Sequence, residues 1–165
     1  MRAIEWDPET GGSITCQVDE LPPPSSSPDK KADFAEVAAR KRLHEVATAV
    51  TVCVSATTSV RKVRALLLAR NLDAVPVVDQ ELHVLGVISR ADLLTAALDG
   101  PVERVTPREL HALPEHAPIA YGIALMGYER VNHVPIITDD GELVGMWDAA
   151  AALRWTAERM GYVGQ

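Results

Sequence analysis

A hydroxyl and a carboxylate stand three residues apart in the segment Ser89-Arg90-Ala91-Asp92, directly after an apolar run. Their spacing permits two interpretations. In the first, Ser89 accepts hydrogen bonds from the first amides of a helix, and Asp92 complements the helix dipole. In the second, the free N–H groups of that helix N-terminus hold a phosphate, while Asp92 binds the two hydroxyls of a ribose. Local spacing alone favours capping, because such pairs are common at helix starts.

Other residues with chemical potential are scattered along the chain. The two cysteines form no metal or redox spacing, and Cys53 lies in an apolar run expected to be a strand, where a small core residue is commoner than a nucleophile. His111 and His116, with Glu109 and Glu115, match no helical or hairpin ligand pair, so we expect solvated loop residues there. The sequence contains no P-loop, nucleophile elbow or paired catalytic carboxylates, and it predicts no enzyme and no bound cofactor.

The elements that must position these residues occur twice. An apolar residue precedes Pro76, two β-branched residues follow it, and Gly86 falls ten positions later. The same pattern returns 59 positions farther on, at Pro135 and Gly145. A duplication of this kind indicates one structural unit used twice, and two like units usually form any binding site where they meet.

Each copy is expected to run strand, helix, strand, strand, helix. In the first copy the expected elements are a strand at 50–54, a helix through Val60 and Leu67, strands at 75–78 and 84–88, and a helix at 91–98. In the second they include a helix at 119–131, a hairpin turn at Asp140-Gly141 and a terminal helix from about Ala149 to Met160, with Gly161 as its stop. Helices interleaved with short strands predict layers of helices packed on small sheets.

The remaining organisation follows from composition. Residues 1–31 contain a Pro/Ser tract and are expected to form a flexible arm. A leading helix is expected within 32–45, starting at Asp33 with Glu36 as its capping-box partner. The two copies then occupy 46–104 and 105–165.

Charge and hydropathy exclude several classes of protein. A net charge of −7 argues against a general nucleic-acid binder, which would need a basic surface. No apolar run reaches membrane-spanning length, and the N-terminus lacks the apolar core of a signal peptide. We therefore expect a cytoplasmic protein with free thiols, without nucleic-acid or membrane partners.

The stretch from about Leu43 to Trp155 resembles a tandem pair of cystathionine-β-synthase (CBS) domains, the arrangement called a Bateman module. The resemblance rests on Val75-Pro76-Val77-Val78-Asp79 and on Gly86-Val87-Ile88-Ser89-Arg90-Ala91-Asp92, which stand in the family's order and spacing. It implies an α+β fold of two pseudo-symmetric CBS repeats, each a small sheet of about three strands packed against two helices. It also implies a regulatory module rather than an enzyme.

The same resemblance implies adenosine recognition. Asp92 would bond ribose hydroxyls, and Ser89 would contact phosphate or ribose. Arg90 could reach a phosphate, although composition alone favours an exposed surface arginine. The residues that would border the base or the phosphate from other segments are Cys53, Val75, Pro76 and His133. With the family pattern added, ligand binding and helix capping are about equally favoured as the role of Ser89 and Asp92.

The second copy departs from this pattern. Asp148 takes the place of the hydroxyl residue, and Ala151 takes the place of the ribose-binding aspartate. A carboxylate at a phosphate position repels the anion, and a methyl group cannot bond a ribose. Trp147 is expected to crowd a small cleft, and Asp148 to cap a helix. At most one intact adenosyl site is predicted.

Two hypotheses from different classes remain. The first is a regulatory module that senses AMP, ADP, ATP or S-adenosylmethionine in one cleft between the repeats. The second is a ligand-free module for dimerisation or for docking an unknown protein target. The resemblance also implies a homodimer. Apolar helix residues that could cover its interface, or could equally be core, are Leu67, Leu68, Met126 and Tyr128.

Overall fold

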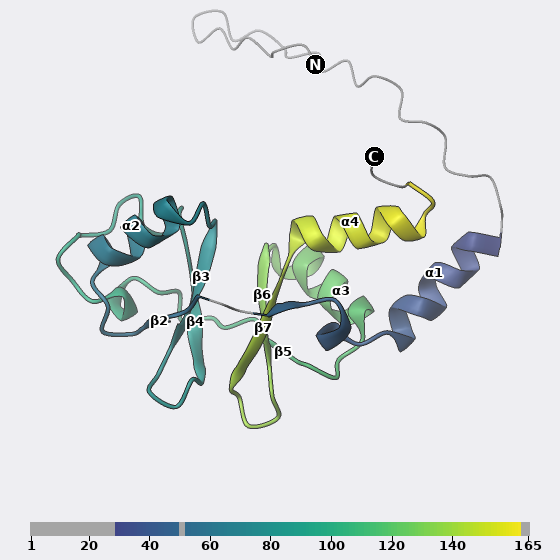
Figure 1. Cartoon of the computed structure of the whole chain (residues 1–165), viewed down its shortest axis with the longest axis horizontal. Helices are drawn as coiled ribbons and strands as arrows, with labels where there is room; N and C mark the ends of the chain where they lie inside the picture. The colour runs from purple at the N-terminus through teal and green to yellow at the C-terminus, as the bar shows by residue number, and fades with distance from the viewer. Residues whose placement is uncertain (1–28, 50–51, 163–165) are drawn as a thin grey trace, which may run out of the picture.

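The computed structural model describes residues 29–49 and 52–162, which form two lobes lying side by side (Figure 1). The first lobe is built from the middle of the chain, and the second from its two ends. The arm predicted over 1–31 lies outside the described residues except for its last three positions.

The first lobe is a three-stranded sheet with a helix packed on it. Its elements are β2 (Val54–Ser55), α2 (Val60–Ala69), β3 (Ala74–Val78), β4 (Val84–Ser89) and the 3-10 turn η2 (Val102–Arg104). The strand order is β2-β3-β4, with β2 parallel to β3 and β3 antiparallel to β4. Helix α2 buries Val60, Val63 and Leu67, which recur at helical spacing on one face. These side chains and those of β3 form the core of this lobe.

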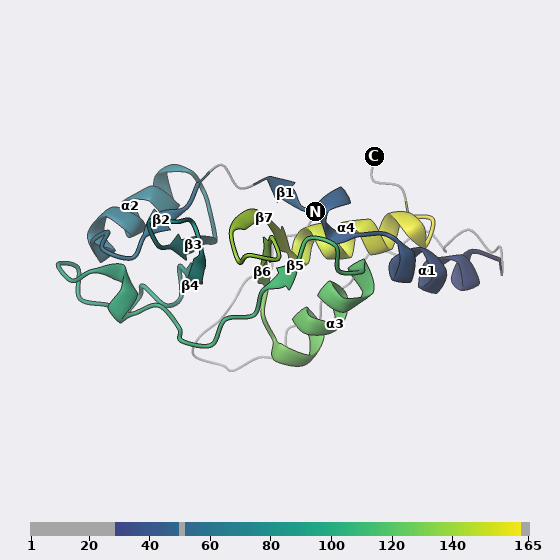
Figure 2. The same cartoon turned by 90° about the horizontal axis from the view of Figure 1, so that it is seen from below.

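The second lobe is a four-stranded sheet packed against helices from both ends of the chain. Its elements are α1 (Asp29–Arg40), the 3-10 turn η1 (Leu43–Glu45), β1 (Thr48–Ala49), β5 (Leu113–Pro114), α3 (Ile119–Glu129), β6 (His133–Ile137), β7 (Leu143–Asp148) and α4 (Ala149–Arg159). The strand order is β1-β7-β6-β5, with β5 parallel to β6. Helices α1, α3 and α4 gather around this lobe (Figure 2), and the Phe34 ring of α1 lies 5.6 Å from the Trp155 ring of α4.

The segment that leads into each copy crosses to the other lobe. Strand β1 precedes the first lobe in sequence, yet it pairs with β7 of the second. Gly145 permits this approach, because a Cβ there would lie 3.0 Å from the carbonyl oxygen of Thr48. In the opposite crossing, a Cβ on Gly86 would lie 2.5 Å from Cγ2 of Thr106. Pro107 stands where Thr48 stands in the first crossing, and a proline has no N–H with which to extend a β ladder.

The predicted fold class of two pseudo-symmetric α+β units is confirmed, as are most of its elements. Helix α2, the hairpins β3–β4 and β6–β7, and the terminal helix α4 occur where the sequence predicts them. Gly141 and Gly161 have φ values of 89° and 93°, as expected of a hairpin turn and a helix stop.

The helix predicted over 91–98 is wrong, because this segment forms turns. Its residues favour a helix, but its far end meets the N-terminus of α2. There the carbonyl groups of Leu98 and Gly100 accept the N–H groups of Arg61 and Val60. A helix continued to Leu98 would direct that carbonyl along its own axis, and the first amides of α2 would lose their partners.

Three smaller details differ from or limit the sequence prediction. Helix α1 begins at Asp29, before the predicted cap at Asp33. Helix α3 ends at Glu129 rather than at Val131. Of the strand predicted at 50–54, residues 50 and 51 lie outside the described range, and Val54 belongs to β2. Among the described residues, no helix has both the length and the apolar character that a membrane span requires.

Candidate functional site

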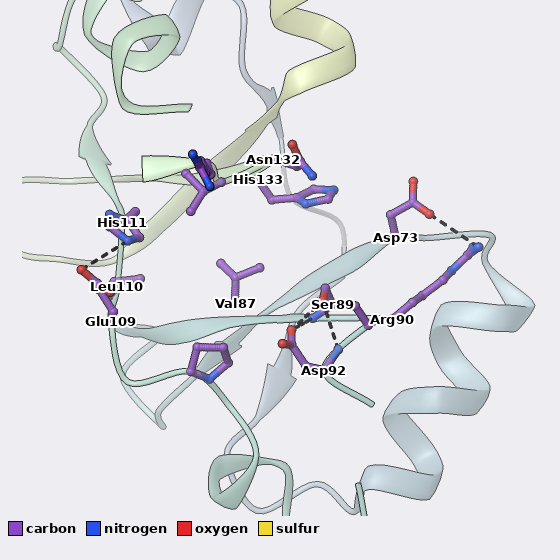
Figure 3. Close-up of a pocket in the computed structure, with 14 residues that line it drawn as sticks. Asp73, Val87, Ser89, Arg90, Asp92, Glu109, Leu110, His111, Asn132 and His133 are labelled. Atoms are coloured by element: carbon purple, nitrogen blue, oxygen red, sulfur yellow. Dashed lines mark hydrogen bonds and ion pairs between the residues drawn. The ribbon is translucent and has the colours of Figure 1, made fainter. Parts of the chain in front are cut away.

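A pocket of about 480 Å³ lies between the two lobes (Figure 3). Three segments provide most of its lining: the end of β4 and the turn after it (87–92), the crossing segment (107–111), and the connection from α3 to β6 (130–133). Ligand pockets for small molecules fall in this range of volume. The Ser89–Asp92 segment of the first copy therefore faces residues of the second copy.

Ser89 and Asp92 form a reciprocal hydrogen-bonded pair at this pocket. Oδ2 of Asp92 accepts from the N–H of Ser89 at 2.8 Å and from its hydroxyl at 2.6 Å, and the N–H of Asp92 points at Oγ of Ser89 at 3.4 Å. This is the geometry of a capping box, although turns rather than a helix follow. Oδ1 of Asp92 makes no hydrogen bond to the described part of the chain, so it is available to accept one from a ligand.

Arg90 is held away from this pair. Its Nε donates to the carbonyl oxygen of Leu72 at 2.7 Å, and its Nη2 donates to Oδ1 of Asn71 at 3.1 Å. Its Nη1 lies 3.5 Å from a carboxylate oxygen of Asp73, and the side chain extends away from Ser89 and Asp92 (Figure 3). Arg90 thus lines the pocket while its guanidinium holds the connection from α2 to β3, and reaching a phosphate would require it to give up these bonds.

His133 opens β6 and is half-buried at the edge of the pocket. Burial lowers the pKa of His133 below the usual value of 6.5, and the nearby carboxylates of Asp148 and Asp73 act in the opposite direction. The net shift is downward, so the imidazole is neutral at neutral pH. A neutral imidazole can donate one hydrogen bond and accept another.

Three residues implied by the resemblance do not line this pocket. Val75 and Pro76 are buried within β3, and Cys53 is exposed and precedes β2. The expectation that Cys53 is a small core residue of a strand is therefore wrong. The physical reason is the crossing, since the segment that borders Ser89 comes from 107–111 and not from the residues around Cys53.

Sequence reasoning missed several residues of the pocket. Those from the second copy are Pro107, Glu109, Leu110, His111, Arg130, Val131 and Asn132. Gly86 is a sequence signal for the residues of the crossing segment, because the segment that passes beside this glycine also lines the pocket. Identifying these residues requires knowing which segment crosses beside Gly86, and the glycine itself does not specify that segment.

Two sets of side chains could offer ligands to a metal. Donor atoms of Glu109, His111 and Glu129 lie within 4.8 Å of one another. The expectation of a solvated loop fails for His111, whose side chain is 18% exposed and whose Nε2 lies 3.7 Å from Glu109. No hydrogen bond within the described residues explains this set. From the sequence, Glu109 and His111 are considered together with Glu115 and His116, and Glu129 is not included.

The second set, Asp79, Glu81 and His83, is explained by the turn between β3 and β4. Asp79 accepts hydrogen bonds from the N–H groups of Glu81 and His83 and contacts the His83 ring at 3.0 Å. Burial raises the pKa of Asp79, but the bonds from His83 and Glu81 outweigh this effect and hold the pKa below its usual value. These carboxylate bonds stabilise the turn.

A second pocket, of about 270 Å³, is the pseudo-symmetric counterpart of the first. Its lining residues Thr48, Asn71 and Met146 each correspond to a lining residue of the larger pocket 59 positions away. Asp148 occupies the position of Ser89, and its Oδ1 accepts from the N–H of Ala151 at 2.7 Å. The prediction that Asp148 caps a helix is confirmed, since it is the N-cap of α4.

Trp147 does not crowd this second pocket, contrary to the sequence prediction. It is 1% exposed and lies in the core of the second lobe. A Cβ on Gly122 of α3 would lie 2.6 Å from Cζ3 of its ring. Alternation along β7 explains the error, because Trp147 points to the face opposite Asp148.

Comparison with known proteins supports the duplication. A sequence model described as the CBS domain matches the chain twice, over residues 43–99 and 102–157. The chain is 24% identical to an uncharacterized 17.7 kDa protein in the bps2 3' region of Acidianus ambivalens, over 64% of this chain and 66% of that protein. It is 27% identical to inosine-5'-monophosphate dehydrogenase of Thermoplasma acidophilum over 56% of this chain, but over 19% of that enzyme. The chain thus spans less than two thirds of either relative.

Solved structures share the architecture. CBSX2 in complex with AMP matches with a TM-score of 0.65 and 19% identity, over 71% of this chain and 96% of that one. The CBS domain pair of protein MJ0100, in complex with 5'-methylthioadenosine and S-adenosyl-L-methionine, matches with a TM-score of 0.66 and 17% identity, over 72% of this chain and 98% of that one. The paired-repeat fold expected from the sequence is confirmed by these likenesses.

Proposed function

Since the chain belongs to the CBS domain family, whose tandem pairs are generally regulatory modules, we propose that it senses an adenosine-containing ligand in the pocket between its lobes. The observation that carries the proposal is the Ser89–Asp92 pair, which borders a pocket of about 480 Å³ and leaves Oδ1 of Asp92 without a bond to the described residues. The complexes of CBSX2 with AMP and of MJ0100 with S-adenosyl-L-methionine support an adenosyl ligand.

The geometry suggests how such a ligand would act. Asp92 would accept from ribose hydroxyls, and the Ser89 hydroxyl would share this contact. The opposite wall comes from the crossing segment 107–111 and from residues 130–133 of the second lobe. A ligand that contacts both walls would stabilise one arrangement of the lobes, which is how binding could be reported to a partner. This role needs no chemical step.

The proposal is tested by thermal unfolding with ATP, ADP, AMP and S-adenosylmethionine. A ligand at a hundredfold excess over Kd adds about 2.7 kcal/mol of stability. We expect at least one of the four to raise Tm, and Asp92→Ala to abolish the rise while the protein stays folded. Asp148→Ala is the matched control, because this carboxylate belongs to the other pocket. If none of the four compounds raises Tm, the sensing proposal fails.

Dimerisation is the second candidate function, and exposed apolar side chains favour it. Leu68 of α2 is 67% exposed and Tyr128 of α3 is 86% exposed. Of the other residues expected at an interface, Leu67 is buried in the first core and Met126 packs against the second. Light scattering at micromolar concentration should give the mass of two chains, and Leu68→Glu with Tyr128→Glu should halve it. A monomer mass for the unmodified chain would contradict this candidate.

A further inference from the structure

Arg130 occupies a backbone conformation that arginine does not favour. It follows the last residue of α3 with φ 56° and ψ 34°, in the left-handed region. Its counterpart 59 residues earlier, Asn71, has a φ of 50° and lies one residue beyond Arg70, the C-cap of α2. Both helices therefore require a left-handed residue where the chain leaves them.

The two positions are filled by residues of different suitability. Asparagine is several-fold enriched in this conformation and often ends helices, whereas other side chains are strained there. Asn71 has a structural role, because its Oδ1 accepts a hydrogen bond from Arg90. Arg130 carries the same backbone strain without such a bond. Strain retained at the wall of a pocket points to a role for the side chain in that pocket.

The charged groups of the pocket indicate which role Arg130 could have, namely binding an anionic group of the ligand. The lining contains two guanidinium groups, Arg90 and Arg130. The first is committed to Leu72, Asn71 and Asp73, as described above. Arg130 is exposed, and within the described ranges it makes no hydrogen bond or ion pair from its side chain. It is therefore the lining cation that a ligand can reach without breaking existing contacts.

We propose that Arg130 binds the phosphate of the ligand and thereby selects phosphorylated adenosine compounds over uncharged adenosine and over the sulfonium S-adenosylmethionine. This inference rests on the proposed function. Guanidinium groups bind phosphate through two parallel, charge-assisted hydrogen bonds, which an uncharged or cationic substituent cannot accept. The ribose end of the ligand would lie at Asp92 and its anionic end at the second lobe.

The experiment compares the affinities of AMP, adenosine and S-adenosylmethionine by titration calorimetry. The unmodified protein should bind AMP about ten- to a hundredfold more tightly than adenosine, as expected for charge-assisted hydrogen bonds. Arg130→Asn copies the residue of the first lobe and relieves the backbone strain. It should leave Tm unchanged or higher, reduce the affinity for AMP to that for adenosine, and change the affinity for adenosine less than about twofold.

Two further variants separate phosphate binding from general electrostatics. Arg130→Lys keeps the charge and should retain part of the preference for AMP. Arg108→Asn removes an exposed charge that lies within the crossing segment but does not line the pocket, and it should leave the preference intact. Equal binding of AMP and adenosine by the unmodified protein, or an unchanged preference in Arg130→Asn, would overturn the inference and leave the sensing function standing. Failure of every adenosine compound to bind would instead overturn the proposed function and this inference with it.

Discussion

The two lobes share one fold but fill their cores differently. In the first lobe, Val63 of α2 and Ile88 of β4 are both fully buried. In the second, the corresponding positions hold Gly122 of α3 and Trp147 of β7, and the glycine leaves no room for a Cβ beside the indole ring. A larger side chain on the sheet thus accompanies a smaller one on the helix. Cores accept such exchanges because they conserve total volume.

The pockets differ in another way. Ser89 and Asp92 line the larger pocket, whereas their counterparts in the second copy are Asp148, which lines the smaller pocket, and Ala151, which does not. A core needs volume, which many pairs of side chains supply, whereas a binding site needs particular atoms at particular places. The duplicated fold is thus preserved although the Ser89–Asp92 pair has no equivalent in the second copy.

The largest expected effect tests the exchange in the cores. Gly122→Val should destabilise the protein by about 3 kcal/mol, because the new side chain overlaps the Trp147 ring. Urea denaturation measures the loss. Gly127→Ala in the same helix is the control, since a Cβ there meets nothing within 4 Å. This control should be neutral or stabilising by up to about 1 kcal/mol.

A double substitution completes that test. Trp147→Ile alone should also cost about 3 kcal/mol, through the cavity it leaves. Combined with Gly122→Val it rebuilds the Val–Ile pair of the first lobe, and the loss should be smaller than the sum of the two by at least about 1 kcal/mol. Additive losses would show that the two lobes do not share this packing rule.

The next effect concerns the lost site. Asp148→Ser together with Ala151→Asp gives the smaller pocket the pair found at Ser89 and Asp92. If the second copy lacks only these two side chains, calorimetry of the double variant should find that the stoichiometry of AMP binding rises from one toward two per chain. The added stability at a hundredfold excess over the new Kd is about 2.7 kcal/mol. A stoichiometry that stays at one would mean that the smaller pocket, of about 270 Å³, differs in shape as well.

Much of the fold was readable from the sequence because its signals are local and repeated. The hairpins around Pro76 and Pro135 are predicted by short apolar runs and by a glycine ten positions after each proline, and α2 is predicted by the helical spacing of its apolar residues. The segment 91–98 has the same local character as a helix and is not one, because the amides at the start of α2 require its last carbonyls. That requirement is tertiary, and local propensity does not contain it.

Of the candidate site, the sequence predicts mainly the residues of the first copy that line one side of the pocket. The spacing of Ser89 and Asp92 is local, so their mutual hydrogen bonds could be anticipated. Of the facing residues, His111 lies near the pocket because the leading segment of the second copy crosses to the first lobe, and Arg130 lies there because the connection from α3 to β6 borders the same pocket. In hindsight the paired glycines encode that exchange, since each leaves space for a crossing backbone, but they say nothing of which side chains it brings.

A smaller effect separates two carboxylates that stand at nearly equivalent places. Asp148→Ala should cost about 1 kcal/mol, because it removes the N-cap of α4. Asp92→Ala, in the absence of ligand, should cost less, since its partner Ser89 begins a turn and not a helix. Thermal and urea unfolding of both variants give the comparison. Equal losses would indicate that the segment after Asp92 depends on capping as α4 does.

The smallest expected effect is a pH dependence located at His133, whose counterpart in the first lobe is Ala74. Burial lowers the pKa of His133 in the folded chain, against the opposing charges of Asp148 and Asp73. Below about pH 6.5 the unfolded chain therefore binds the proton more readily than the folded chain. Stability present above this pH must decline as the pH falls toward the lowered folded pKa. His133→Ala removes that contribution, so its stability should fall less than that of the unmodified protein between pH 7.5 and 5.5 in urea unfolding. Parallel curves for the two proteins would show that His133 exchanges its proton as freely in the folded chain as in the unfolded one.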